Sequence, residues 1–264
     1  MAEITVNTFR KRKNENEKLV MVTAYDAIGA SAAFDAGIDI LLAGDSMANT
    51  ALGYDSTLPL SMEEALYHTA AVKRGAPGAF VIFDMPFMSY QVSDEEAMRN
   101  AARAIKEVNA DAVKLEGGAD YAPLIAKLVR AGIPVMAHIG LLPQKVKTSG
   151  GYKAAGKTED AVQQLLDDAR KVEEAGAFAV VLECMPAAVA AEITDAVSIP
   201  TIGIGSGAGC SGQVQVLTDV LGLSSFTPRH ARHYAELGEL MRQALKSYAD
   251  EVRQGTFPRK ENSF

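Results

Sequence analysis

Six short apolar runs, each ending on an ionisable residue, recur along this sequence. They are 22–26, 40–45, 80–84, 112–116, 135–138 and 180–183, and they end on Asp26, Asp45, Asp84, Glu116, His138 and Glu183. An unbroken apolar run of this length is typical of a strand buried on both faces, whose last side chain stands at the carboxyl end of the strand. The pattern therefore predicts a ring of ionisable groups around one pocket.

Helix signals separate these runs. Gly37 suits the end of a helix over 27–36, and Ser61 with Glu64 forms a capping box at the start of a helix that extends to Arg74. We predict strands at 19–23, 39–43, 79–84, 111–116, 134–138, 178–183, 201–205 and 214–217, a solvated opening helix at 7–18 and a closing helix at 234–253. Eight alternations of strand and helix predict a (β/α)8 barrel with an extra N-terminal helix, and a doubly wound open sheet is the alternative.

Composition limits the class of protein. With 264 residues and 48% hydrophobic content, the chain can form one catalytic domain over 1–264. A net charge of −7 and a pI near 5.2 argue against nucleic acid or an anionic membrane as a partner. Two cysteines cannot make a disulfide framework, and the first residues lack the charged and apolar blocks of a signal peptide. We expect a cytoplasmic enzyme.

Two connections are much longer than usual for an α/β protein. The first joins the second strand to the helix at Ser61, and the second follows His138 and contains 141–144 and 150–153. Long ordered loops are commonly functional, so both are candidate lids over the pocket.

Three acids at successive strand ends suggest a metal site. Asp45, Asp84 and Glu116 are far apart in sequence, but a barrel brings its consecutive strand ends close together. Oxygen ligands favour a hard ion such as Mg²⁺, which keeps some water ligands. Any one of these acids can instead cap the helix that follows it, but the three together favour the metal site.

Three further residues are candidates for chemistry in the same pocket. Lys114 precedes Glu116 by two, so both side chains point to one face of a strand, where the lysine can bind an anion or pair with an acid. Glu183 is a candidate base, and His138 is either a partner in the chemistry or a structural histidine. Cys184 has no histidine placed to activate it and is interpreted as a packing residue, while the glycines of 203–207 are interpreted as giving backbone clearance.

Several motifs resemble those of the ketopantoate hydroxymethyltransferase family, also called 3-methyl-2-oxobutanoate hydroxymethyltransferases. The resemblance extends from about residue 5 to the C-terminus, and the Asp-Ser-Thr-Leu-Pro and Lys-Leu-Glu-Gly-Gly segments are its most specific parts. The matching segments are 23–26, 44–46, 53–59, 68–72, 84–87, 113–118, 138–141, 150–153 and 182–184.

The resemblance implies a fold, a reaction and a set of roles. It implies a barrel of the phosphoenolpyruvate/pyruvate type that transfers a hydroxymethyl group from 5,10-methylenetetrahydrofolate to 3-methyl-2-oxobutanoate, the first step of pantothenate biosynthesis, with Mg²⁺. It also implies a homodecamer of two pentamer rings. The implied roles are metal binding for Asp45, Asp84 and, through water, Glu116; oxo-acid binding for Asp45, Ser46, Asp84, Lys114 and His138; and proton removal by Glu183.

The chain departs from the family pattern in four places, none of which contains an implied ligand. Met47-Ala48-Asn49 replaces the commoner Leu-Gly-Met, and Ala137, Ser206 and Asn262 replace the commoner glycine, alanine and histidine.

Two other functions fit the same architecture. A Mg²⁺-dependent 2-oxo acid lyase or mutase of the isocitrate lyase type is expected to contain a Lys-Lys-Cys-Gly-His run, which this sequence lacks. The other is a non-catalytic barrel that binds a metabolite.

Overall fold

Eight parallel strands close into a barrel in the computed structural model, which describes residues 4–38, 40–224 and 226–264. The strands are β1 (Leu19–Thr23), β2 (Ile40–Ala43), β3 (Phe80–Asp84), β4 (Ala112–Glu116), β5 (Val135–Gly140), β6 (Ala179–Glu183), β7 (Thr201–Ile204) and β8 (Gly212–Gln215). Each pairs with its neighbours in chain order, and β1 pairs with β8. The predicted (β/α)8 barrel is confirmed, although the predicted first residue of the second strand, Asp39, lies outside the described residues.

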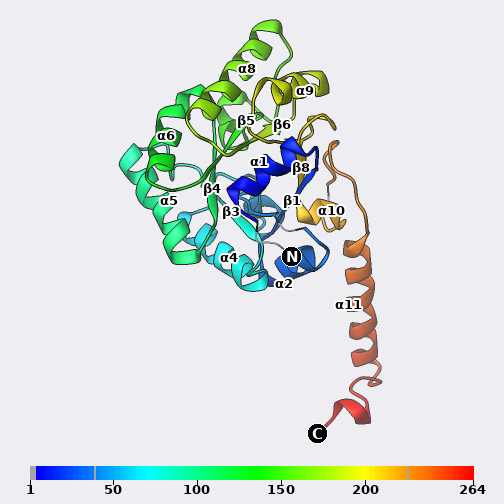
Figure 1. Ribbon diagram of the computed structural model, residues 1–264. Coiled ribbons are helices and arrows are strands. Elements are labelled where there is room, and N and C mark those ends of the chain that lie inside the picture. The colour runs from blue at the N-terminus through cyan, green and yellow to red at the C-terminus, as the bar shows by residue number, and fades with distance from the viewer. Residues whose placement is uncertain (1–3, 39, 225) are drawn as a thin grey trace. The chain divides into compact units, whose positions relative to one another are not determined.

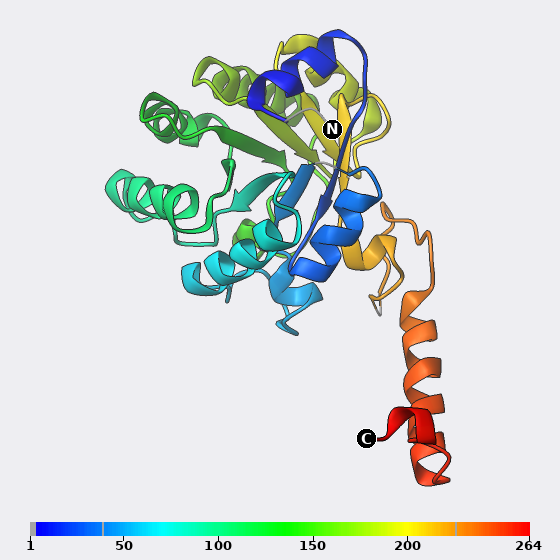
Figure 2. The ribbon, with the colours of Figure 1, turned by 60° about the horizontal axis from the view of Figure 1, so that its bottom comes forward.

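Helices connect the strands and cover the outside of the barrel, and one more helix, α1, precedes β1 (Figures 1 and 2). They are α1 (Val6–Asn14), α2 (Ala27–Asp35), α3 (Met47–Thr50), α4 (Met62–Gly75), α5 (Asp94–Val108), η1 (Ala119–Tyr121), α6 (Ala122–Arg130), η2 (Pro143–Lys145), α7 (Val146–Ser149), α8 (Glu159–Glu174) and α9 (Ala187–Ala196). The capping box at Ser61 and Glu64 is confirmed, and Ser93 and Thr158 accept backbone hydrogen bonds at the starts of α5 and α8.

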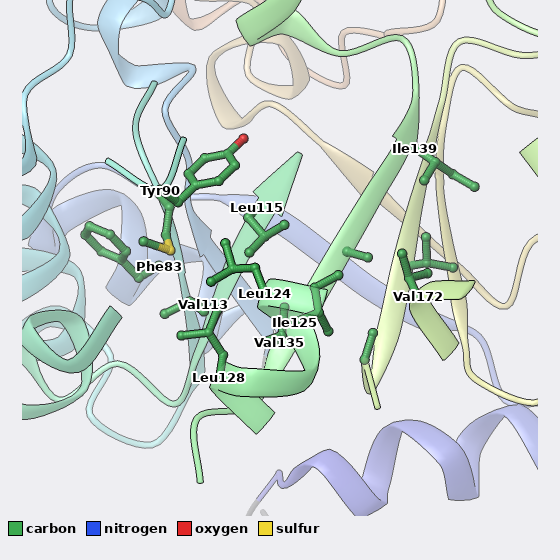
Figure 3. Packing of buried hydrophobic residues seen from close by; sticks show 14 of the residues in the cluster. Phe83, Tyr90, Val113, Leu115, Leu124, Ile125, Leu128, Val135, Ile139 and Val172 are labelled. Atoms are coloured by element: carbon green, nitrogen blue, oxygen red, sulfur yellow. The ribbon is translucent and has the colours of Figure 1, made fainter. Parts of the chain in front are cut away.

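Two apolar clusters explain why the strands are buried on both faces. One cluster joins outward side chains such as Val113, Leu115 and Val135 to Leu124 and Leu128 of α6 (Figure 3). The other contains the alternate strand residues, including Leu19, Met21, Ile40, Phe80, Ile82, Met136 and Val181, which fill the barrel interior. Because side chains alternate along a strand, the residues that continue this inward set at the carboxyl ends face the mouth of the barrel.

The N-terminal helix is shorter and less solvated than the sequence indicated. It ends at Asn14, and Phe9 within it is fully buried. The Phe9 ring lies 5.2 Å from that of Phe80 and 5.0 Å from that of Phe178, at the amino ends of β3 and β6. The sequence did not indicate this contact, because the residues around Phe9 are mostly charged or polar. The helix covers the end of the barrel away from the carboxyl ends of the strands.

The last strand begins two residues earlier than the predicted 214–217. It starts at Gly212, and Leu217 already belongs to the next helix. A Cβ at position 212 would lie 2.4 Å from the carbonyl oxygen of Leu19, so only glycine fits where β8 closes against β1. The prediction was placed too late in the chain, because the apolar residues that follow indicate a strand more strongly than this glycine and the glutamine after it.

The chain divides into two compact units, Met1–Val216 and Leu217–Phe264. The second contains α10 (Leu217–Val220), α11 (Leu237–Arg253) and η3 (Lys260–Asn262). The prediction of one catalytic domain over 1–264 stays a prediction. Within the described ranges, none of the helices combines the length and apolar character needed to cross a membrane.

Candidate active site

A polar layer follows the apolar layers of the barrel interior at its carboxyl end. Asp84 continues the inward set of β3, Lys114 and Glu116 that of β4, and Glu183 that of β6. Strand register aligns Asp84 with Lys114, and Glu116 with His138. Asp45 follows β2 by two residues and is buried. The structure thus brings together the site residues predicted from these strand ends.

One member of the predicted ring does not belong to the site. Asp26 is exposed, and its carboxylate accepts a hydrogen bond of 2.7 Å from the backbone N–H of Gly29 at the start of α2. β1 ends at Thr23, so Asp26 lies beyond the strand and acts as a helix cap. The prediction that all six runs contribute to one ring is wrong at this position.

Lys114 and Asp84 form a buried ion pair. The lysine Nζ donates to Asp84 Oδ1 at 2.6 Å, and the backbone N–H of Asp45 donates to Asp84 Oδ2 at 3.2 Å. Burial alone would lower the pKa of Lys114, but the charges of Asp84, Glu116 and Asp45 raise it above its ordinary value. Lys114 therefore stays charged at neutral pH.

Two other acids of the layer, Asp45 and Glu116, do not form an ion pair of this kind with a lysine of the described ranges. Burial, with repulsion from Asp84, raises the pKa of Asp45 to about 7. Burial also raises the pKa of Glu116 well above its ordinary value, against the opposing effect of Lys114. The Glu116 Oε1 atom is buried and has no hydrogen-bond partner among the described residues. Carboxyl groups at this end of the barrel therefore outnumber the one buried lysine, and burial favours the protonated form of Asp45 and Glu116.

His138 lies between two carboxylates. Its Nε2 is 3.2 Å from Glu183 Oε2, and its Nδ1 is 3.9 Å from Glu116 Oε1. The Nδ1 contact is too long for a hydrogen bond, and the Nε2 contact is short enough but does not have the geometry of one. Burial and the charge of Lys114 lower the pKa of His138, so the ring is neutral at pH 7. Glu183, with 15% of its side chain exposed, is the most accessible of the acids in these pairs.

A glutamine that we did not predict connects the acids. Gln144, in η2, donates from Nε2 to Asp45 Oδ2 at 3.0 Å and to the carbonyl of Met85 at 2.9 Å. Its backbone N–H donates to Glu116 Oε2 at 3.0 Å, and its Oε1 accepts from the Tyr90 hydroxyl at 2.8 Å. The sequence marked the loop that contains Gln144 as a lid, but no local pattern indicates that this side chain turns inward.

Ser46 completes the mouth on the side of β1. Its Oγ lies 2.9 Å from the hydroxyl of Tyr25, which accepts a hydrogen bond of 2.8 Å from Thr23. Tyr25 and Thr23 are both buried, so this chain of hydrogen-bonded hydroxyl groups fixes the position of the Ser46 hydroxyl beside Asp45. The tyrosine was part of a motif in the sequence, but its contact with Ser46 depends on the pairing of β1 with β2.

The remaining sequence features have structural explanations. A Cβ on Gly203 would lie 2.9 Å from Cys210 Sγ, and one on Gly207 would lie 2.5 Å from the Cβ of Ala187, so these glycines give close packing. Cys184 has a positive φ of 49°, and burial with the charge of Glu183 raises its pKa to about 11. Its thiol is therefore protonated at neutral pH.

The donors at the mouth suit a hard cation. Asp45 and Asp84 present carboxylates beside the unpartnered Glu116 oxygen, and oxygen donors are the ligands that Mg²⁺ prefers. Within residues 4–38, 40–224 and 226–264, no three His, Cys, Asp or Glu side chains are grouped closely enough to form a complete metal cluster. One or two carboxylates with water and substrate oxygens are the usual Mg²⁺ arrangement, and that arrangement fits here.

A closed parallel barrel with a buried layer of acids at its carboxyl end defines a (β/α)8-barrel enzyme, and solved structures share this fold. Phosphonopyruvate hydrolase, in a complex with oxalate and Mg²⁺, superposes with a TM-score of 0.64 at 12% identity, covering 98% of this chain and 93% of that one. The 2,3-dimethylmalate lyase of the PEP mutase/isocitrate lyase superfamily gives 0.61 at 17% identity, covering 100% and 92%.

Comparison of sequences narrows the class to one family. The model of the ketopantoate hydroxymethyltransferase family matches residues 3–260. The 3-methyl-2-oxobutanoate hydroxymethyltransferase of Clostridium novyi is 54% identical over 261 residues, which cover 98% of this chain and 95% of the relative. The chain belongs to the ketopantoate hydroxymethyltransferase family.

Proposed function

We propose that this enzyme transfers a hydroxymethyl group from 5,10-methylenetetrahydrofolate to 3-methyl-2-oxobutanoate and forms 2-dehydropantoate, in the first step of pantothenate biosynthesis. Family membership supports the reaction. The observation that carries the chemistry is the buried Glu116 Oε1, which has no hydrogen-bond partner among the described residues and lies in a layer with more carboxyl groups than cations. Formation of product from the two substrates, measured with and without Mg²⁺, tests the proposal.

Asp45 and Asp84 hold the cation directly in this proposal, and Glu116 contacts it through water. When bound, Mg²⁺ polarises the 2-oxo group of the substrate and makes the proton on C3 more acidic. Asp84→Ala should abolish Mg²⁺-dependent binding of the oxo acid in calorimetry. Unchanged binding would show that Asp84 has no part in the metal site.

Lys114 and Ser46 bind the oxo acid. The lysine is charged and buried beside Asp84, and Ser46 presents its hydroxyl at the same mouth. Lys114→Met should weaken binding of the oxo acid at saturating Mg²⁺. Wild-type affinity and turnover in this variant would reduce the lysine to an ion-pair partner of Asp84.

Glu183 removes the proton from C3. It is the accessible carboxylate of the His138–Glu183 pair, and the neutral His138 beside it can donate a hydrogen bond to the substrate or to Glu183. A positioned base contributes about 10²–10⁴ in rate. Deuterium exchange at C3, with Mg²⁺ present and folate absent, should be slowed by that factor in Glu183→Gln. Wild-type exchange in Glu183→Gln together with slow exchange in His138→Gln would make the histidine the base.

The family resemblance also leads us to propose a homodecamer of two pentamer rings. α11 has exposed apolar side chains, including Leu240, Met241, Leu245 and Tyr248, which a contact between copies would cover. Sedimentation equilibrium should give ten chains per particle, and Leu245→Glu should give smaller particles. A wild-type monomer in the same experiment would contradict the assembly.

A further inference from the structure

A basic loop lies beside the acidic mouth. Residues 141–157, here called the basic loop, contain Lys145, Lys147, Lys153 and Lys157 and no aspartate or glutamate. Acidic residues are in fact missing from the whole stretch 121–158, in a chain whose net charge is −7. Such a local excess of positive charge attracts anions.

Both ends of the basic loop are fastened to the end of β6. The backbone N–H of Leu141 donates to the carbonyl of Glu183 at 2.9 Å, and that of Ala155 donates to the carbonyl of Cys184 at 3.0 Å. Gly140, just before the loop, packs so closely that a Cβ there would lie 2.3 Å from the Glu183 carbonyl oxygen. The loop is thus held against the backbone of the proposed base.

A cavity of about 170 Å³ lies within this loop. Lys145, Ser149, Gly151, Tyr152 and Lys153 line it, together with Gly140–Leu142. Lys145 and Lys153 are exposed, and neither forms an ion pair within the described ranges. A Cβ on Gly150 would lie 3.5 Å from Lys153 Nζ, so the ammonium of this exposed lysine lies close to Gly150 of the same loop. Two uncompensated cations therefore border one small polar cavity.

Tyr152 connects the cavity to the acidic mouth. The cavity borders the end of β6, because Leu141 of its wall donates its backbone N–H to the carbonyl of Glu183 at 2.9 Å. Burial raises the pKa of Tyr152, and the charges of Asp45, Glu183 and Glu116 raise it further, in accord with this position. Tyr152 is also part of the cavity wall. A molecule that reacts at the mouth could therefore extend past this ring toward the two lysines.

We propose that this cavity binds the carboxylate-bearing glutamyl tail of the one-carbon donor, with Lys145 and Lys153 as its cationic contacts. The inference rests on the proposed function, in which Lys114 already meets the carboxylate of the oxo acid at the centre of the barrel. The donor carries the second anionic group of the reaction, and that group lies at the opposite end of the molecule from the pterin. Lysine and carboxylate form charge-assisted hydrogen bonds, which are stronger than neutral ones.

Steady-state kinetics with three donors test the assignment. The donors are the methylene derivatives of tetrahydropteroate, which lacks glutamate, of monoglutamyl tetrahydrofolate and of its triglutamyl form. In Lys145→Ala and Lys153→Ala we expect the KM for the glutamylated donors to rise about three- to tenfold each, as for loss of a partly solvated charged contact. The KM for the pteroate donor, the KM for the oxo acid and kcat should not change.

Lys147→Ala is the matched control, because Lys147 is an exposed lysine of the same loop that does not line the cavity. Its KM values should equal those of the wild type. Equal rises for all three donors, or a rise in Lys147→Ala as large as in the cavity variants, would overturn the assignment. So would wild-type KM values in the Lys145→Ala/Lys153→Ala double variant.

Failure of the proposed function would give a different result. If the wild-type enzyme exchanges the C3 proton but forms no product from any of the three donors, the donor of the proposed reaction is wrong. Calorimetry with tetrahydrofolate alone then decides about the cavity. Equal affinity of the wild type and the double variant, or no binding by either, overturns the cavity assignment, and weaker binding by the double variant supports it.

Discussion

Gln144 shows how much a single side chain contributes to the order of this site. Its amide contacts Asp45, Met85 and Tyr90, and its backbone contacts Glu116, so one residue connects three strand ends. The acids were predictable because each ends an apolar run. Gln144 was not, because the direction of a loop side chain depends on contacts distant in sequence.

Replacing Gln144 by leucine should destabilise the protein and loosen the site. The change leaves the Tyr90 hydroxyl and the Met85 carbonyl, both buried, without this partner, at a cost of about 2–4 kcal/mol in the free energy of unfolding. Because Asp45 also loses a contact, Mg²⁺ affinity should fall about 10- to 100-fold. Urea unfolding and calorimetry measure the two effects. Gln91→Ala, which removes a half-exposed donor to the same Gln144 oxygen, is the control and should cost less than about 1 kcal/mol.

The thiol of Cys184 should react only at high pH. Its pKa is raised to about 11, so the reactive thiolate increases about tenfold per pH unit through the whole range from about pH 7 to 9.5. Alkylation by iodoacetamide, followed by mass spectrometry at each pH, should show this unbroken slope. Cys184→Ser identifies the labelled site, since Cys210 is the other cysteine. A plateau near the ordinary thiol pKa of about 8.5 would contradict the shift.

At the scale of elements, local signals account for most of the barrel. Apolar runs and helix caps gave strand positions within one or two residues, because a strand buried on both faces needs nearly continuous apolar sequence. The prediction for β8 was displaced by two residues at both ends, because the position of this strand depends on the space beside Leu19, which no local pattern reveals. α1 was taken as solvated because only one of its residues, Phe9, is buried.

The junction of β5 and the basic loop should be unusually sensitive to substitution. Gly140 has φ of 102°, and a Cβ would lie 2.3 Å from the Glu183 carbonyl oxygen. Gly132 also has a positive φ, of 89°, but has open space around it. Gly132→Ala should therefore cost about 1–2 kcal/mol, for backbone strain alone. Gly140→Ala should cost more and should slow C3 exchange, because Glu183 must move. Equal losses of stability in urea would show that the clash is relieved elsewhere.

At the scale of the whole barrel, its two ends have different tasks. The amino end is closed by Phe9 against Phe80 and Phe178, and the carboxyl end contains the acids. β3 and β6 extend from one end of the barrel to the other, so the packing at their amino ends lies far from the acids at their carboxyl ends. We therefore expect that a substitution can change the stability of the protein without changing its chemistry.

Phe9→Ala should lower the free energy of unfolding by about 3–5 kcal/mol, as for other buried phenylalanines. The rate of C3 exchange per folded molecule should not change, because the acids lie at the opposite ends of the same strands. Phe226→Ala, at an exposed phenylalanine, is the matched control and should leave unfolding within about 0.5 kcal/mol of the wild type. Loss of exchange in folded Phe9→Ala protein would contradict this separation.

The fastening of the basic loop to two adjacent carbonyl groups, those of Glu183 and Cys184, makes this segment exchangeable. A loop that leaves and rejoins the barrel at neighbouring residues can be replaced by one of another length while both attachment points stay in place. The acids at the strand ends remain on the scaffold during such a graft, although Gln144 must be kept with them. Donor preference could therefore be transplanted between members of the family without rebuilding the centre that activates the oxo acid.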